Sequence, residues 1–218
     1  MAAFDFGRKL DQATVDTLVE REYHLDMKAA LSESWQLFRA HPGEFIGFTI
    51  ILFLVSSLSS LFSGVGSLIV SSIFAPLSAG FLIATFRIRA GKEFSFNDLF
   101  SGFSHFLPLM LAGLATGGIV AAGFILLILP AIYFMVSYLF ASAFVVDYGV
   151  EFWQAMEISR RLVGKHWFRL FGFMILLIII NLLGVLALGI GMLVSIPVTS
   201  CAVAIAYRSI VGEHDGEW

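Results

Sequence analysis

Charged residues divide this chain into polar blocks separated by long apolar stretches. No Asp, Glu, Lys or Arg occurs in residues 45–86, 99–146 or 170–207, which are 42, 48 and 38 residues long. One helix needs about 20 apolar residues to cross roughly 30 Å of hydrocarbon, so each stretch is long enough for two helices. The pattern therefore predicts an all-α polytopic membrane protein, in which three helical hairpins supply six transmembrane helices.

These stretches also predict how the chain is divided. We expect a cytoplasmic N-terminal amphipathic segment at 1–44, a six-helix membrane domain at 45–212 and a cytoplasmic tail at 213–218. The predicted spans are 45–63, 67–88, 104–120, 124–146, 168–188 and 192–209. Apolar residues make up 59% of the chain and charged residues 13%, and the mean hydropathy is +0.91. Soluble domains carry about a quarter charged residues, so this composition favours a membrane.

The positive charges predict the orientation. All 13 Lys and Arg residues precede span one, follow span two, separate spans four and five or follow span six. The turns at 63–67, 117–123 and 188–191 contain none. Positive residues concentrate in cytoplasmic loops, so both termini are expected in the cytoplasm. The start of the chain also lacks the basic and apolar regions of a cleaved signal peptide.

Parts of the sequence repeat. An ungapped shift of 125 residues places one set of residues on identical ones: Ala30, Ser34, Leu37, His41, Gly47 and Phe48 fall on Ala155, Ser159, Leu162, His166, Gly172 and Phe173. A shift of 121 residues places Pro76, Arg87 and Gly91 on Pro197, Arg208 and Gly212. The middle hairpin matches loosely, through His105 and Pro130. Because every hairpin starts and ends on the cytoplasmic side, we expect three parallel repeats about an axis along the membrane normal.

The polar segments between hairpins carry helical patterns. Apolar residues recur at helical spacing at Met27, Leu31, Trp35 and Phe38, and again at Trp153, Met156 and Val163. Asp26 is positioned to cap the first helix. Ser95 and Asp98 form a capping box that opens a short helix through Phe100. We expect these amphipathic helices to lie in the headgroup layer, where they anchor the hairpins or dock a partner.

Four motifs carry a resemblance: AlaLeuSerGluSerTrpGlnLeuPheArg at 30–39, its echo at 155–163, ProLeuSerAlaGlyPhe in span two, and the loop ArgAlaGlyLysGluPheSerPheAsnAspLeuPhe. Together they resemble uncharacterised bacterial six-helix integral membrane families related to the membrane domain of some glycerophosphodiester phosphodiesterases. In that family a separate soluble domain performs the chemistry, and no stretch here matches it. The resemblance implies an architecture, a bacterial cytoplasmic (inner) membrane and no activity.

Three histidines lie at equivalent entries of spans one, three and five: His41, His105 and His166. If the hairpins pack around one axis, these imidazoles could meet and bind zinc or a similar metal. A headgroup phosphate, a backbone group or water serves such a histidine equally well, so we expect neither a metal site nor a cofactor. Cys201 is the single cysteine, which leaves no thiol pair for a metal.

A path for a solute is the second possible site. Pro76 and Pro197 each lie 11 residues before the arginine that ends their helix. That spacing is about 16 Å, near mid-bilayer, where matched interrupted helices can mark a binding site together with Asn181. No ionisable group lies deep in a span, so an ion-driven pump is not expected. Packing explains the two prolines more simply.

Six of the 13 Lys and Arg residues are expected to form a band that attracts anionic headgroups on the cytoplasmic side: Arg87, Arg160, Arg161, Lys165, Arg169 and Arg208. A protein partner or a homo-oligomer is also possible, whereas a net charge of −3 implies no nucleic acid. The sequence has no acid pair, activated nucleophile or phosphate-binding loop, so no enzyme is expected. We therefore expect a non-enzymatic scaffold or accessory component of a membrane assembly; the alternative is a permease for an apolar or lipid-like solute.

Overall fold

The computed structural model describes residues 9–20, 23, 25–61, 65–126, 128–187 and 189–212. All elements in these ranges are helices: α1 (Gln12–Glu20), α2 (Met27–Ala40), α3 (Pro42–Leu61), α4 (Val65–Ser78), α5 (Gly80–Arg89), the 3₁₀ helix η1 (Phe96–His105), α6 (Phe106–Leu126), α7 (Ile128–Ser137), α8 (Ala141–Tyr148), α9 (Phe152–Gly164), α10 (Trp167–Leu186) and α11 (Met192–Val211). No strand occurs within the described ranges, so the predicted all-α class is confirmed.

Five helical stretches are long and apolar enough to cross a membrane: Ser72–Arg89, Phe96–Ile125, Ile128–Tyr148, Trp167–Leu186 and Met192–Val211. Helices α2 and α3 meet at an angle of 97°, and they give a sixth candidate span if the two are counted as one broken span. Length and composition therefore support a multi-pass membrane protein with five to six spans. The predicted turn residues 62–64 and residue 188 lie outside the described residues. The turn predicted at 117–123 is wrong, because these residues lie inside α6, which continues to Leu126.

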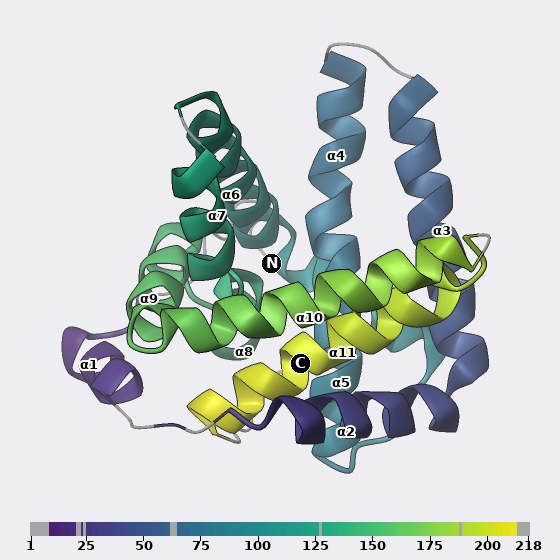
Figure 1. Ribbon diagram of the computed structural model, residues 1–218, viewed down its shortest axis with the longest axis horizontal. Coiled ribbons are helices and arrows are strands. Elements are labelled where there is room, and N and C mark those ends of the chain that lie inside the picture. Colours follow the sequence, from purple (N-terminus) through teal and green to yellow (C-terminus); the bar gives the residue numbers. More distant parts are fainter. Residues whose placement is uncertain are drawn as a thin grey trace.

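The long helices form three antiparallel pairs, α3 with α4, α6 with α7, and α10 with α11 (Figure 1). In this view α10 and α11 run across the molecule, while the α3–α4 pair stands upright. The second helix of a pair is more enclosed than the first: 72% of the α11 span is buried, against 28% of the α10 span. The ends of α5, α8 and α11 therefore form the interior of the fold.

Helices η1 and α9 each pack on the second helical stretch of the pair before them. Helix η1 packs on α4 and α5, and α9 packs on α7, α8 and α6. Helix α2 packs along α11, the last helix among the described residues. The packing therefore runs in a closed cycle, because the first long-helix pair is held against the third.

Backbone contact fixes η1 on the α4–α5 junction. Gly102 lies against the carbonyl oxygen of Pro76, and Gly80 lies against the carbonyl oxygen of Leu99, with no room for a Cβ at either glycine. The predicted capping box is present, since the Ser95 amide donates to Asp98 Oδ2 at 2.7 Å. The short helix continues past the predicted Phe100 to His105.

Helix α9 is fixed on its neighbour by a single hydroxyl. Residues 138–140 form a turn that interrupts the helical path between α7 and α8, and the buried side chain of Ser159 reaches this turn. Its Oγ donates to the Ser137 carbonyl at 2.8 Å and accepts from the Phe140 amide at 3.2 Å. Buried backbone groups that lose helical partners need such a replacement, so Ser159 stabilises the break.

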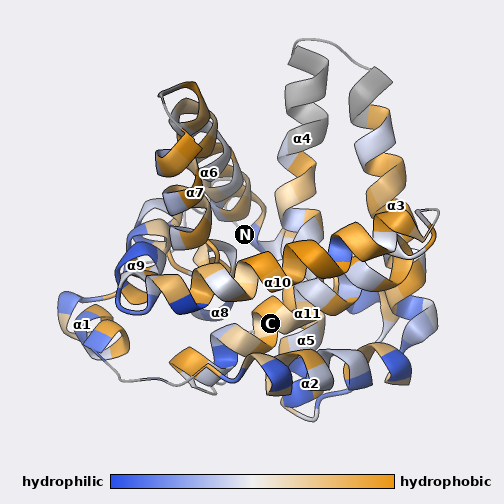
Figure 2. Cartoon of the chain, viewed as in Figure 1, coloured by the Kyte–Doolittle hydropathy of each residue, from blue (hydrophilic) through white to orange (hydrophobic). Residues whose placement is uncertain are grey.

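Helix α2 begins as the sequence predicts. Asp26 Oδ1 accepts from the amides of Lys28 and Ala29, both at 3.0 Å, which confirms the N-cap. Phe38 is buried, whereas Trp35 is 46% exposed and stacks on it. In Figure 2 the hydrophilic residues concentrate on α1, α2 and α9, and α10 is hydrophobic along most of its length.

Candidate functional site

A buried ion pair lies where α8 and α11 end. Arg208 Nη2 is 2.8 Å from Asp147 Oδ1, and Arg208 Nη1 donates to Asp147 Oδ2 at 3.2 Å. The Tyr207 hydroxyl donates to the same Oδ2 at 2.9 Å. The Arg208 and Asp147 side chains are 1% and 0% exposed. Removing two charges from water is costly, and the bidentate geometry with a third donor offsets part of that cost.

Aromatic rings enclose this pair and connect it to α5. The Arg208 guanidinium carbon lies 4.1 Å from the ring centroid of Phe86, in cation–π contact. The Tyr207 ring packs against Phe140 and Phe144, with centroids 5.9 and 5.1 Å away. The pair thus joins the ends of α5, α8 and α11. We call Phe86, Asp147, Tyr207 and Arg208 the inner junction.

The inner junction corrects one sequence expectation and adds a residue that sequence reasoning missed. Arg208 was expected to contact lipid headgroups, but its guanidinium is enclosed by protein and bound to Asp147. Asp147 was not among the expected site residues. The available signal was that residues of opposite charge, Asp147 and Arg208, end two of the apolar stretches. An Asp147 carboxylate held by three donors is suited to a structural role rather than to proton transfer.

The other five expected headgroup cations separate into two groups. Arg87 lies 3.6 Å from Asp98, Arg160 lies 2.7 Å from Glu157, and Arg161 lies 2.8 Å from Asp16. Hydrogen bonds from Arg160 to Glu157 raise the pKa of this guanidinium. Lys165 and Arg169 form no ion pair with any described residue.

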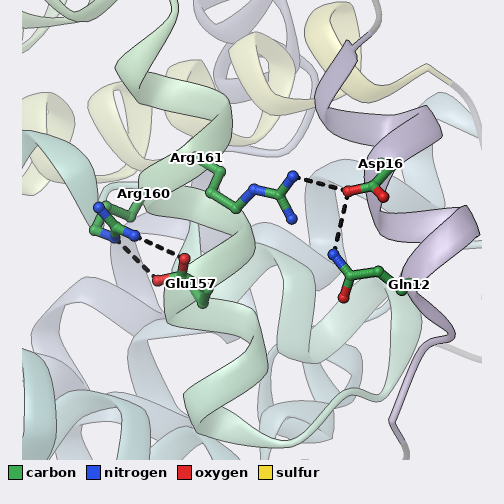
Figure 3. A network of polar contacts seen from close by, with 5 residues as sticks. All are labelled: Gln12, Asp16, Glu157, Arg160 and Arg161. Carbon is green, nitrogen blue, oxygen red and sulfur yellow. Dashed lines mark hydrogen bonds and ion pairs between the residues drawn. The ribbon is translucent and has the colours of Figure 1, made fainter.

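Figure 3 shows how the N-terminal segment binds α9 through some of these contacts. Asp16 accepts from Arg161 at 2.8 Å and from Gln12 at 3.2 Å. Gln154 bonds both backbone groups of Leu10, at 2.8 and 2.7 Å. Val15 and Val19 are buried below these polar contacts. Helix α1 is therefore docked on α9.

Asn181, of the possible solute path, bonds within the protein. Its Oδ1 accepts from Ser195 at 3.0 Å, and its Nδ2 donates to the Leu177 carbonyl at 3.0 Å and to Thr199 Oγ1 at 3.1 Å. We call Asn181, Ser195 and Thr199 the α10–α11 clasp. Pro197 lies in the same turns of α11 and is buried. Pro76 is also buried, but its carbonyl faces η1, so the structure does not bring it into the clasp.

The three entry histidines have separate surroundings. His41 lies 4.0 Å from Glu44 and packs edge-on against Phe94, and His105 Nδ1 lies 2.9 Å from the Ser104 hydroxyl. His166 packs edge-on against Tyr23, with centroids 4.8 Å apart. Burial raises the pKa of the Tyr23 phenol to about 12. No group of three His, Cys, Asp or Glu side chains within the described ranges is placed to hold a metal ion.

No protein-family model matches this chain, and no curated protein or solved structure is significantly similar to it. The resemblance to bacterial six-helix families therefore rests on the sequence motifs alone and stays a prediction.

Proposed function

We propose that this chain is a non-enzymatic integral membrane protein that acts as a scaffold or accessory component of a membrane assembly. The observation that carries the proposal is the α10–α11 clasp. Asn181 uses both amide hydrogens and its carbonyl oxygen within the protein. A solute-binding site would need such groups to face the solute. Satisfied polar groups inside apolar helices instead favour a packed helical framework.

The proposed arrangement has six spans in three parallel hairpins, with both termini in the cytoplasm of a bacterial cell and the hairpins in its inner membrane. The one-sided distribution of the 13 Lys and Arg residues supports this orientation. A short helix (α2, η1 or α9) followed by a long helix (α3, α6 or α10) and a returning helical stretch (α4–α5, α7–α8 or α11) occurs three times, which supports repeats. Short helices that join one pair to the next are suited to anchoring.

Reporter fusions test this topology. Fusions at Gly189, and at Ser63 and Leu127 outside the described residues, should report the periplasm. Gly118 is unsuitable for a fusion because it lies inside α6. Fusions at Gly91, at Gly164 and after the C-terminus should report the cytoplasm. One reversed loop would contradict the parallel-hairpin arrangement.

A second experiment separates a scaffold from a permease for an apolar or lipid-like solute. The full chain is reconstituted in vesicles containing a fluorescent phospholipid, and the rate at which an external reductant quenches the inner-leaflet probe is measured. For a scaffold, we expect the quenching rate in vesicles that contain the protein to equal the rate in protein-free vesicles. Acceleration that falls in the Asn181→Leu variant, but not in a matched Leu182→Ala variant, would favour the permease, because Leu182 is an exposed neighbour outside the clasp.

Assembly is tested on the chain extracted from its membrane in polymer-bounded lipid discs. A scaffold should emerge with a particle mass above that of one 24.0 kDa chain with its lipid, and with the same companion in constant stoichiometry. Discs that contain single chains only, at all extraction conditions, would contradict the proposal.

A further inference from the structure

Two cations at the corner between α9 and α10 differ from the rest of the expected headgroup band. Lys165 and Arg169 have no ion-pair partner among the described residues, whereas Arg87, Arg160, Arg161 and Arg208 each have a carboxylate. Lys165 is exposed and Arg169 is half-buried. A cation that is already paired attracts an outside anion weakly, so the attraction of this band is concentrated at the corner.

The surroundings of the corner favour an anion. Lys165 precedes the N-cap residue His166, and Arg169 lies in the first turn of α10, so both side chains start within about one turn of each other. No Asp or Glu occurs between Glu157 and Glu213, and the Glu157 carboxylate is held by Arg160. An approaching phosphate therefore meets two positive charges and no free carboxylate from its own stretch of chain.

An apolar face continues from the corner along α10. Phe168 is 83% exposed, and four of the exposed residues that follow it recur at spacings of three and four: Ile175, Ile179, Leu182 and Leu186. These residues share one side of a helix. Arg169 and Ile179 are ten residues apart, about 15 Å, which is half the thickness of the hydrocarbon. That length matches the acyl chain of one leaflet.

Aromatic side chains mark the level of the corner. The Trp167 ring stacks on Phe171 and Tyr133, with centroids 5.0 and 6.1 Å away, and its indole nitrogen donates to the Tyr133 carbonyl at 3.5 Å. Trp and Tyr prefer the boundary between headgroups and hydrocarbon. The corner and its apolar face thus have the polarity of a phospholipid in one leaflet.

The basic pair is not a consequence of the repeat. The shift of 125 residues that aligns His41 with His166 places Lys165 on Ala40 and Arg169 on Glu44. At the first hairpin entry, Glu44 lies 4.0 Å from His41, so the position that corresponds to Arg169 carries the opposite charge. Two cations are therefore particular to the third hairpin.

We propose that Lys165 and Arg169 bind the phosphate of an anionic phospholipid whose acyl chain lies along the α10 face from Phe168 to Ile179. This inference rests on the proposed membrane location. The ligand is a lipid, because the phosphate site and the apolar face are continuous. The site gives the third hairpin a preferred lipid that the other two lack.

Native mass spectrometry of the purified full chain tests this site in mixed micelles of phosphatidylglycerol and phosphatidylcholine with identical acyl chains. The wild type should bind phosphatidylglycerol preferentially. The Lys165→Gln/Arg169→Gln variant should lose about 30-fold in that preference, since each cation near a headgroup contributes about 1 kcal/mol, or about fivefold. The charge-preserving Lys165→Arg/Arg169→Lys variant should keep it.

Lys28→Gln/Arg39→Gln is the matched control, because both residues are exposed, have no ion pair with a described residue and remove the same charge. We expect this control to change the preference by less than about twofold. Equal losses in the two neutralised variants, no preference in the wild type, or displacement of the lipid by millimolar inorganic phosphate would each overturn the proposal. Membrane fractionation of the same variants separates the two claims: a chain that stays in the membrane without lipid preference refutes only the lipid site.

Discussion

Neutralising Asp147 is expected to weaken the fold strongly. The Asp147→Asn substitution keeps the shape of the side chain and an acceptor for the Tyr207 hydroxyl, but it leaves the charge of buried Arg208 without a counter-charge. Breaking a buried pair by removing one partner costs about 3–5 kcal/mol. We therefore expect Asp147→Asn and Arg208→Met each to lower the free energy of unfolding by that amount. The double variant should lose less than the sum, because neither charge is then left alone.

The chain supplies its own control for this experiment. Arg160 binds Glu157 with the same bidentate chemistry, at 2.9 and 2.7 Å, but these side chains are 42% and 45% exposed. An exposed pair contributes at most about 1 kcal/mol, so Glu157→Gln should have a small effect. The measurement is denaturant unfolding in detergent micelles, followed by circular dichroism. If Asp147→Asn costs no more than Glu157→Gln, burial does not strengthen the pair, and the reasoning about the inner junction is wrong.

Three further predictions concern packing, pH and metal. Gly102→Ala should destabilise the protein by about 1–3 kcal/mol in the same unfolding assay, because a Cβ meets the Pro76 carbonyl, whereas Gly117→Ala, with nothing within 4 Å, should not. Unfolded tyrosine ionises near pH 10, and the folded Tyr23 phenol has a pKa of about 12, so the contribution of Tyr23 to stability should be constant below about pH 10 and fall from there to pH 12. Tyr23→Phe should remove this contribution, so the variant should lose less stability than the wild type between pH 10 and pH 12; an identical loss in the two proteins would contradict the burial argument. Replacing His41, His105 or His166 with glutamine should leave the protein folded, and the wild type should contain no bound metal that these substitutions remove. Stoichiometric metal in the wild type that is lost in all three single variants would show a metal site.

The helical class and the apolar stretches could be predicted because they depend on residues close together in sequence. A stretch without charge can form a span wherever its neighbours lie, and the Asp26 cap needs only the next turn of chain. The positions at which helices are interrupted were harder to predict. Proline does not mark them consistently, because Pro197 lies inside unbroken α11 and Pro130 lies in the first turn of α7, where proline is tolerated. The break between α2 and α3 at Pro42 and the break after Pro76 do fall near a proline.

The inner junction could not be predicted because it depends on which helices become neighbours. Asp147 and Arg208 are 61 residues apart, and each one alone only marks the end of an apolar stretch. Arg208 has the same residue type and repeat position as Arg87, but Arg87 reaches Asp98 near the surface and Arg208 reaches Asp147 inside. Sequence pattern predicts that such cations lie near the membrane boundary. It does not predict their partners.

The packing of α2 on α11 has a consequence for synthesis of the protein. The buried face of α2, with Ala30, Ser34 and Phe38, is synthesised long before its partner helix α11, because the first two hairpins and α10 lie between them in the sequence. The first two hairpins can be inserted before α11 exists, but that face has no native cover until then. Contacts between distant parts of a chain form late and leave apolar surface exposed meanwhile. During that interval a chaperone or the membrane surface has to shield α2, and a ribosome stalled before residue 192 would hold a chain that quality-control proteases can recognise.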